Sequence, residues 1–364
     1  MRSRKERQGE KMKHFNKYML YRLKSSAIRT LILTLIASVF VFVLCIENIS
    51  VLRYENGRYY QNSSTDSAGV VMLALSVLLP ILETYSLKDS KTLDVVFSLP
   101  IKRRSIAAAH YLSGIIQLIF ISLAAFLTAN FTTLIAGRNG YFATVHMIPM
   151  FFVILLFSLC IYSFVIFIFV KANTLGDGIV FVAGFYGAVC FILEKASSLF
   201  ETRIFISYFS RKILHTDVIV ESFSRILERL AKILGFFDGK VDEYIFDDYY
   251  KSTTTLEFFN DRELLTTLII WLVIGILCTI GYVFTVSRYR AEKAGDISDS
   301  VFGYRFIIPA FGFSLMVGSI DNSALTNILI LMAMLIGYII YRRSFKIKLE
   351  DLFTIAAALV FQFL

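Results

Sequence analysis

Long runs of apolar residues, separated by short polar segments, dominate this chain. The first run, residues 27–46, is long enough to cross a bilayer core of about 30 Å as a helix. Five more runs of comparable character follow, at 68–86, 105–131, 147–170, 178–193 and 264–286. This pattern predicts an all-α fold, a polytopic membrane bundle with six core spans.

Apolar residues continue beyond these six spans in shorter and looser runs. Residues 303–320 and 324–341 predict a C-terminal helical hairpin. The last run, 352–364, corresponds to only about 20 Å of helix at 1.5 Å per residue, which is too short to span a bilayer. We expect it either to lie in the interface or to be the front part of a segment that continues in a longer product.

The polar segments define the expected domain organisation. Residues 1–26 form a basic N-terminal segment, in which 12–25 mixes Lys and Arg with Phe, Tyr and Leu. That mixture is typical of a helix in the headgroup layer, and the alternative is an ordinary basic flank of the first span. The remaining expected parts are spans 1–5 (27–193) with a cytoplasmic segment (87–104), an outer loop (194–263), span 6 (264–286), a cytoplasmic loop (287–302) and the C-terminal hairpin and tail (303–364).

The outer loop is about seventy residues long and mostly polar. Residues 217–234 place apolar side chains on one face of a predicted amphipathic helix, and an acidic, tyrosine-rich patch follows at 242–250. The loop could serve as an outer gate or release surface for a substrate. It could equally be a cap on the bundle with no such role.

The distribution of Lys and Arg predicts the orientation. With the N-terminus in the cytoplasm, the inner segments hold 24 basic residues and the short outer loops hold three. The net charge of +9 then reflects attraction to anionic lipid at the cytoplasmic face, and not a nucleic-acid surface. We therefore expect a multi-pass protein of the plasma membrane with a cytoplasmic N-terminus.

Composition and missing motifs argue against a soluble enzyme. The chain is 57% hydrophobic and only 18% charged, with a mean hydropathy of +0.67. It contains no phosphate-binding GxxxxGK[ST] loop, no HExxH zinc motif and no GxSxG nucleophile elbow. The four cysteines lie inside apolar runs and do not form a CxxC pair. We expect no catalytic residue, no cofactor and no metal.

Ionisable residues within the spans would indicate an ion-coupled carrier. The acidic residues nearest the spans are expected at span ends, within reach of water: Glu47, Glu83, Asp177 and Asp321. The polar residues in mid-span are neutral: Ser113, Gln117, Ser158, Tyr162, Ser163 and Thr279. This pattern disfavours a self-contained secondary transporter, and predicts that any driving energy comes from another chain.

The polar stretch at residues 87–104 is the most informative one. From Ser90 its pattern predicts a short amphipathic helix in which Leu93, Val96 and Phe97 share a face and which Pro100 ends. A basic trio then anchors the start of the third span at the level of the lipid phosphates: Lys102, Arg103 and Arg104. Such a partly apolar knob at the membrane surface suits docking of a cytoplasmic partner. The alternative is a loop whose basic residues only set the topology.

Residues 91–106, KTLDVVFSLPIKRRSI, closely resemble the membrane subunits of type-2 ATP-binding-cassette (ABC) transporters. In that family a similar stretch after the second span forms the coupling helix, which sits in a groove of the ATPase. Residues 287–295, SRYRAEKAG, look like the basic tail after the sixth span of bacterial members, particularly Gram-positive ones. The apolar runs after residue 300 depart from the simplest six-span pattern.

The resemblance implies a permease subunit of an exporter that moves an amphipathic, lipid-like, drug or peptide substrate. A separate cytoplasmic ATP-binding subunit would hydrolyse ATP, and the permease would pair with itself or with a sister chain. The residues it implies for docking are Leu93, Asp94, Phe97, Leu99 and Pro100. Two alternatives stay open at this point: an ATPase-independent carrier, and a membrane scaffold or sensor that transports nothing.

Overall fold

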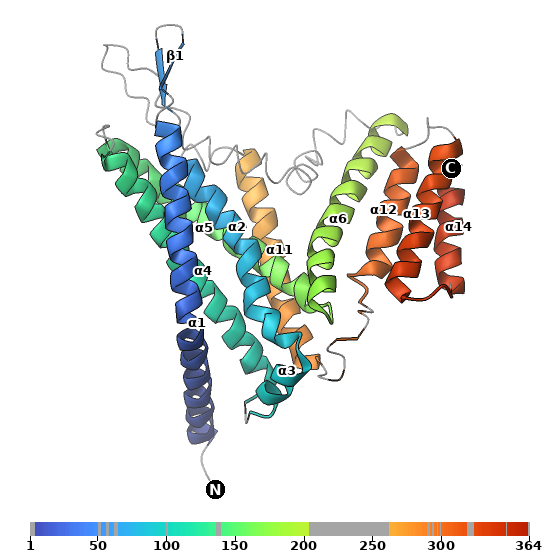
Figure 1. The fold of residues 1–364 in the computed structure, drawn as a ribbon, viewed down its shortest axis with the longest axis horizontal. Helices are drawn as coiled ribbons and strands as arrows, with labels where there is room; N and C mark the ends of the chain where they lie inside the picture. The colour runs from blue at the N-terminus through green and yellow to red at the C-terminus, as the bar shows by residue number, and fades with distance from the viewer. Residues whose placement is uncertain are drawn as a thin grey trace. The chain divides into compact units, whose positions relative to one another are not determined.

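The computed structural model describes residues 4–49, 52–55, 58–61, 65–99, 101–135, 140–203, 262–289, 292, 295, 296, 298, 300–318, 324–346 and 348–362. These residues are almost entirely helical, which confirms the predicted all-α fold (Figure 1). One short antiparallel hairpin is the exception. Its strands β1 (Leu52–Glu55) and β2 (Arg58–Gln61) follow the first helix.

Among the described residues, seven helices are long and apolar enough to cross a membrane. Six of them coincide with the six predicted core spans, and the seventh, Leu325–Arg342, lies in the predicted C-terminal hairpin. The other arm of that hairpin is shorter, with an apolar stretch at Tyr304–Met316. The predicted amphipathic helix at 217–234 and the acidic patch at 242–250 lie outside the described residues.

Helix α1 (Arg4–Ile49) runs for 46 residues as one continuous helix. Residues 12–25, for which we expected a helix in the headgroup layer or a basic flank of the first span, belong to this same helix. Their place relative to the membrane stays a prediction. The helical hydrogen bonding continues through residue 26 into the apolar run, so the basic N-terminal segment is the first part of the same rod. The reason is local: neither Gly nor Pro occurs between Lys11 and Ile49 to end the helix.

The chain divides into two compact units, and two of the boundaries between them fall within helices, α3 (Ser90–Phe97) and α5 (Gly140–Val170). The first unit contains α1, α2 (Thr65–Thr84), α4, α11 (Arg262–Arg288), most of α5 and the end of α3. Helix α4 (Arg103–Ile135) packs against α1, α2 and α11, so it is the central helix of this unit (Figure 1).

Aromatic and hydroxyl side chains join α4, α5 (Gly140–Val170) and α11 inside the first unit. The Tyr111 hydroxyl lies 2.7 Å from Ser163 Oγ and 2.8 Å from Thr279 Oγ1. Trp271 is almost fully buried, and its ring contacts the rings of Phe157 and Phe164. These contacts hold three apolar helices in one register, where apolar packing alone gives little directional preference.

The second unit contains α6 (Leu175–Arg203), α12 (Tyr304–Gly318), α13 (Ala324–Arg342) and α14 (Leu349–Gln362). Helix α12 is the one that contacts the other three. Its contacts with α6 are largely aromatic, as in the pair of Phe185 with Phe306. The 14-residue α14 agrees with the expectation that the last apolar run is too short to span.

Candidate functional site

Residues 87–104, to which the resemblance gives a coupling role and which we call the coupling segment, belong to the connection between α2 and α4. That connection consists of a 3-10 turn (η1, Tyr85–Leu87), helix α3 (Ser90–Phe97) and a short link to Arg103, where α4 begins. This confirms the predicted short helix from Ser90. Asp89 precedes the helix, and its Oδ1 accepts a hydrogen bond from the Lys91 backbone N–H at 3.4 Å, as an N-cap residue does.

The apolar face of α3 is turned into the protein. Leu93 is fully buried. Val96 and Phe97 pack against a cluster of buried side chains from α1 and α4. That cluster consists of Tyr18, Ile106 and Ala109. Two of the residues predicted to dock a partner, Leu93 and Phe97, therefore hold the segment in place, and their contact with a partner stays a prediction.

The opposite face of the coupling segment is exposed and mixes charge with apolar surface. Asp94, a predicted docking residue, lies on this face, and Leu99 lies just beyond the helix with 36% of its surface exposed. Val95 is 68% exposed and was not among the predicted residues. We call Lys91, Asp94, Val95 and Leu99 the docking face. The structure does not describe Pro100.

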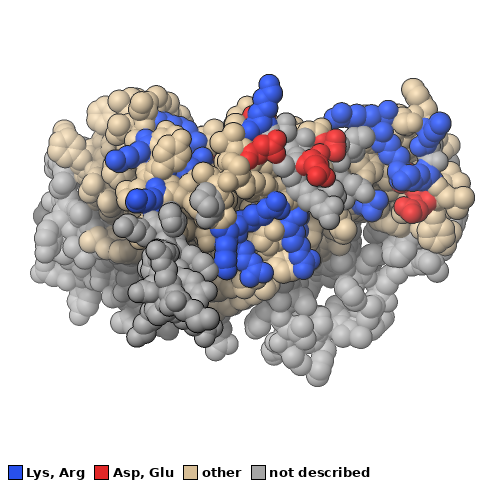
Figure 2. Space-filling model, turned by 90° about the horizontal axis from the view of Figure 1, so that it is seen from below, with Lys and Arg blue, Asp and Glu red and all other residues tan. Residues whose placement is uncertain are grey.

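The three predicted basic anchors lie at the start of α4. Lys102, Arg103 and Arg104 are all exposed. The guanidinium group of Arg103 lies over the ring of Phe97, 4.5 Å from its centroid, and so covers the outer edge of the packed end of α3. Figure 2 looks at the molecule from below the view of Figure 1, and blue Lys and Arg side chains are more frequent there than red carboxylates. Anchoring to lipid by these residues remains a prediction.

Lys88 is a residue of the coupling segment that the sequence analysis did not single out. Its side chain is buried, and its ammonium group donates hydrogen bonds to the Val170 carbonyl oxygen at 3.3 Å and to the Ala172 carbonyl oxygen. Val170 is the last residue of α5, whose C-terminal carbonyl groups favour a cation. Lys88 thereby fixes the start of the coupling segment to the α5–α6 connection.

The surroundings of Lys88 change its proton affinity. Its ammonium group lies 5.1 Å from the ring centroid of Phe169 and 5.6 Å from that of Tyr289. Burial lowers the pKa of Lys88 to about 7, and the negative charge of Asp177 offsets only part of this effect. We expected Asp177 at a span end within reach of water, and its side chain is half-buried. Its carboxylate accepts hydrogen bonds from the hydroxyl groups of Ser298 at 2.7 Å and Tyr304 at 2.9 Å.

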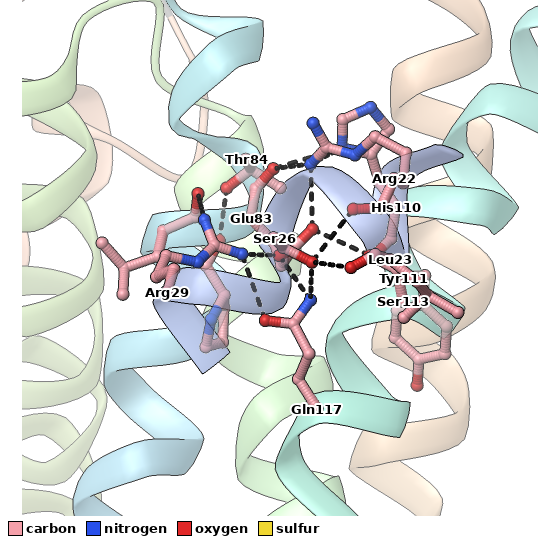
Figure 3. Close-up of polar contacts among 12 residues, drawn as sticks. Arg22, Leu23, Ser26, Arg29, Glu83, Thr84, His110, Tyr111, Ser113 and Gln117 are labelled. Carbon is pink, nitrogen blue, oxygen red and sulfur yellow. Dashed lines mark hydrogen bonds and ion pairs between the residues drawn. The ribbon is translucent and has the colours of Figure 1, made fainter. Parts of the chain in front are cut away.

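The most extensive polar network in the first unit surrounds Glu83, near the end of α2 (Figure 3). Glu83 is fully buried, which contradicts our expectation that it reaches water. Two arginines from α1 pair with its carboxylate: Arg22 Nη2 lies 2.9 Å from Oε2, and Arg29 Nη2 binds Oε1. The sequence analysis missed this site because both arginines lie more than fifty residues away along the chain.

Residues of α4 complete the hydrogen bonding of Glu83. Gln117 Nε2 donates to Oε1 at 2.8 Å, and the Ser113 hydroxyl donates to Oε2 at 2.9 Å. Each carboxylate oxygen therefore accepts from two donors, which fills the acceptor sites of an ionised carboxylate. A buried charge is tolerated only with such pairing. The network is best explained as a clamp between α1, α2 and α4.

The same arginines bind the carbonyl end of α2. Arg29 Nη1 donates to the Leu82 carbonyl oxygen and Arg22 Nη2 to the Glu83 carbonyl oxygen, both at 3.1 Å. These carbonyl groups have no partner within a helix that ends at Thr84, and cations near them are favourable. His110 adds a link to α1, since its Nε2 lies 3.1 Å from the Tyr18 hydroxyl.

The described residues contain no group of three or more His, Cys, Asp or Glu side chains that could hold a metal ion. The features described in this part of the chain are an exposed face of α3, a buried lysine and a buried clamp.

Comparison with known proteins gives a family for the part of the chain that contains the coupling segment. Residues 57–220, just under half of the chain, match the family described as ABC-2 family transporter protein. Searches for similar curated proteins and for similar solved structures found no match. An ABC transporter of this kind includes an ATP-binding partner. Residues 57–220 are thus similar to the ABC-2 family of transporter proteins, and the apolar helices found among the described residues agree with a membrane protein of that kind.

Proposed function

We propose that this chain is one permease half of an exporter in the plasma membrane, with its N-terminus in the cytoplasm. A separate ATP-binding subunit docks on the docking face, and a second permease, identical or related, completes the pathway. The cargo is an amphipathic molecule such as a lipid, a drug or a peptide. The source we infer is a Gram-positive bacterium, from the resemblance of residues 287–295.

The observation that carries this proposal is the arrangement of α3. One face of the helix is packed into the chain's own interior, and the other presents an exposed Val95 between the charges of Lys91 and Asp94. A short helix packed in this way transmits force to α1 and α4, because it cannot rotate about its own axis independently of them. The segment lies within the residues that match the transporter family.

The two ends of the coupling segment support a route for that force. At its start Lys88 is bonded to the end of α5, and at its end Phe97 packs against α1 and α4. Closure of the ATPase would displace the docking face, and both connections would transfer the displacement to spans. Such coupling requires that the ATPase contact differs between two states of the permease.

A second permease has surface available on α1. Only 17% of the most apolar part of this helix is buried within the chain. We propose that the exposed side of α1, with the second and fifth spans, faces either lipid or the partner permease.

Affinity purification of the tagged chain in mild detergent, followed by mass spectrometry, tests the proposal. We expect a stoichiometric ATP-binding subunit that is lost in V95D. The matched control is V301D, because Val301 is 71% exposed and lies outside the coupling segment. Leu93→Asp is unsuitable alone, since a buried charge would disturb folding as well as docking. Retention of the subunit by V95D would contradict the assigned face.

The alternatives give different results in proteoliposomes. The proposed exporter moves cargo only with the ATP-binding subunit and ATP. An ion-coupled carrier would move cargo on an ion gradient without that subunit, and a scaffold or sensor would move none. The buried Glu83 is the feature that would suit a carrier, but all its acceptor sites are already occupied by four donors.

A further inference from the structure

A small cavity on α1 has no role in the proposed transport cycle. It has a volume of about 90 Å³ and is lined by Arg22, Ser25, Ser26 and Arg29. These residues follow one another at the spacing of a single helical face, over two turns. Every lining side chain carries hydrogen-bond donors, and none is acidic. The volume is several times the space that one water molecule requires.

The two arginines are not fully used by the Glu83 clamp. The Arg22 and Arg29 side chains keep 19% and 33% of their surface exposed, although Glu83 beneath them has none. In addition, the Nε atom of each arginine is buried and has no hydrogen-bond partner. Two guanidinium groups against one carboxylate leave one positive charge, and the cavity lies between them.

The cavity lies where the outer surface of α1 changes character. Up to residue 24, the exposed residues of α1 include the charged Lys17 and Lys24. From residue 27 onward they are apolar for several turns and include Ile28 and Leu31, which are 73% and 62% exposed. A helix surface that changes from basic to apolar in this way crosses from the headgroup layer into the hydrocarbon, so the cavity is at the depth of lipid phosphates.

We propose that this cavity is a binding site for a phosphate group, and that the phospholipids of the adjoining leaflet supply it. The partly exposed side chains of Arg22 and Arg29 and the Ser25 hydroxyl hold the phosphate oxygens, while Glu83 keeps both arginines in position. Bidentate contact with phosphate oxygens is a geometry for which guanidinium groups are well suited. The inference goes beyond the proposed function, because it requires neither an ATPase nor a cargo.

The site is tested on the full chain in detergent by native mass spectrometry and thermal unfolding. The probes are phosphatidylglycerol, diacylglycerol, which has the same tails but no phosphate, and inorganic phosphate. We expect phosphatidylglycerol to bind and to raise the unfolding temperature, diacylglycerol to do neither, and inorganic phosphate to compete weakly. Binding of inorganic phosphate without any binding of phosphatidylglycerol would overturn the lipid source.

The discriminating variant is S25E, which places a negative charge at the cavity without removing any bond of the Glu83 clamp. Its control is N16E, which adds the same charge to an exposed position elsewhere on α1. We expect phosphatidylglycerol to bind S25E about fivefold more weakly than the wild type, with little change for N16E. The proposed site is overturned if phosphatidylglycerol binding falls equally in both variants, or if it falls in neither. The ATP-binding subunit should still copurify with S25E, so failure here leaves the proposed function intact.

Discussion

The Nη2 atom of Arg22 lies 2.9 Å from Oε2 of Glu83, although 61 residues separate the two along the chain (Figure 3). This ion pair connects the basic beginning of α1 to the carbonyl end of α2. Removal of either partner would be destabilising, since it leaves a charge in the protein interior without its full compensation. The pair therefore makes the packing of α1 on α2 and α4 specific to one register.

Loss of the Glu83 charge should destabilise the first unit. Glu83→Gln leaves Arg22 and Arg29 facing each other without a counter-charge, so we expect the free energy of unfolding to fall by about 3 kcal/mol. Thermal unfolding in detergent measures this. Glu292→Gln is the control, because Glu292 is exposed and should change stability by less than about 0.5 kcal/mol. Equal stability of both variants would contradict the clamp.

Gly114 is required by close packing between α4 and α5. A methyl group at this position would overlap the hydroxyl of Tyr162 and lie 3.1 Å from Glu83 Cγ. We expect Gly114→Ala to be destabilising and to be partly rescued by Tyr162→Phe. Gly176→Ala is the matched control, since nothing lies within 4 Å of its added methyl and Ala is the better helix former. A neutral Gly114→Ala in the same unfolding assay would be inconsistent with the described packing.

Substitutions on the two faces of α3 should have different effects, on stability for the buried face and on docking for the exposed face. Leu93→Ala removes a fully buried side chain and should lower the free energy of unfolding by about 2–5 kcal/mol. Val95→Ala, on the exposed face, should alter it by less than about 0.5 kcal/mol. When equal amounts of folded permease are compared in copurification, we expect Val95→Ala to lose more of the ATP-binding subunit than Leu93→Ala. Loss of partner binding by Leu93→Ala at matched folding would show that the buried face takes part in docking.

Lys88 should make stability depend on pH. Its pKa is about 7 in the folded protein and 10.5 in an unfolded chain, so between these values the unfolded chain holds a proton that the folded protein has released. The free energy of unfolding should therefore rise with pH across this window and be lowest below pH 7. Comparison with Lys88→Met isolates the effect, because that variant lacks the group.

The measurement is the difference in unfolding temperature between wild type and Lys88→Met as pH increases from about 7 to about 10. Over this whole range, the unfolding temperature of the wild type should rise relative to that of Lys88→Met. Lys91→Met serves as the control, because Lys91 is exposed and its removal should leave the pH dependence unchanged. A flat difference for Lys88→Met would mean that Lys88 is charged in the folded state over the whole range.

The sequence predicted the helices well, because a span of about twenty apolar residues is specified locally by composition and length. It predicted less well what the polar residues do. The burial of Glu83 depends on Arg22 and Arg29, which reach it only after α1 has packed beside α2. No local pattern around Glu83 distinguishes it from an acidic residue at a wet span end.

The coupling segment shows a second kind of limit. Its amphipathic pattern correctly placed Leu93, Val96 and Phe97 on one face, but a pattern does not say what covers that face. The chain itself covers it, and the exposed Val95 would have been found only by asking which apolar residue breaks the pattern. Lys88 gave no local signal, because its partners are backbone carbonyl groups 82 and 84 residues away.

The continuity of α1 has a mechanical consequence. By length, its 46 residues correspond to about 69 Å of helix, more than twice the thickness of a bilayer core. Roughly thirty ångströms of this rod precede residue 27, and a tilt of about 10° in the membrane-embedded part would sweep the far end by about 5 Å. The Glu83 clamp lies close to the pivot of such a movement. If α1 tilts as one rod, it would convert a small rotation between spans into a displacement of several ångströms at its N-terminal end.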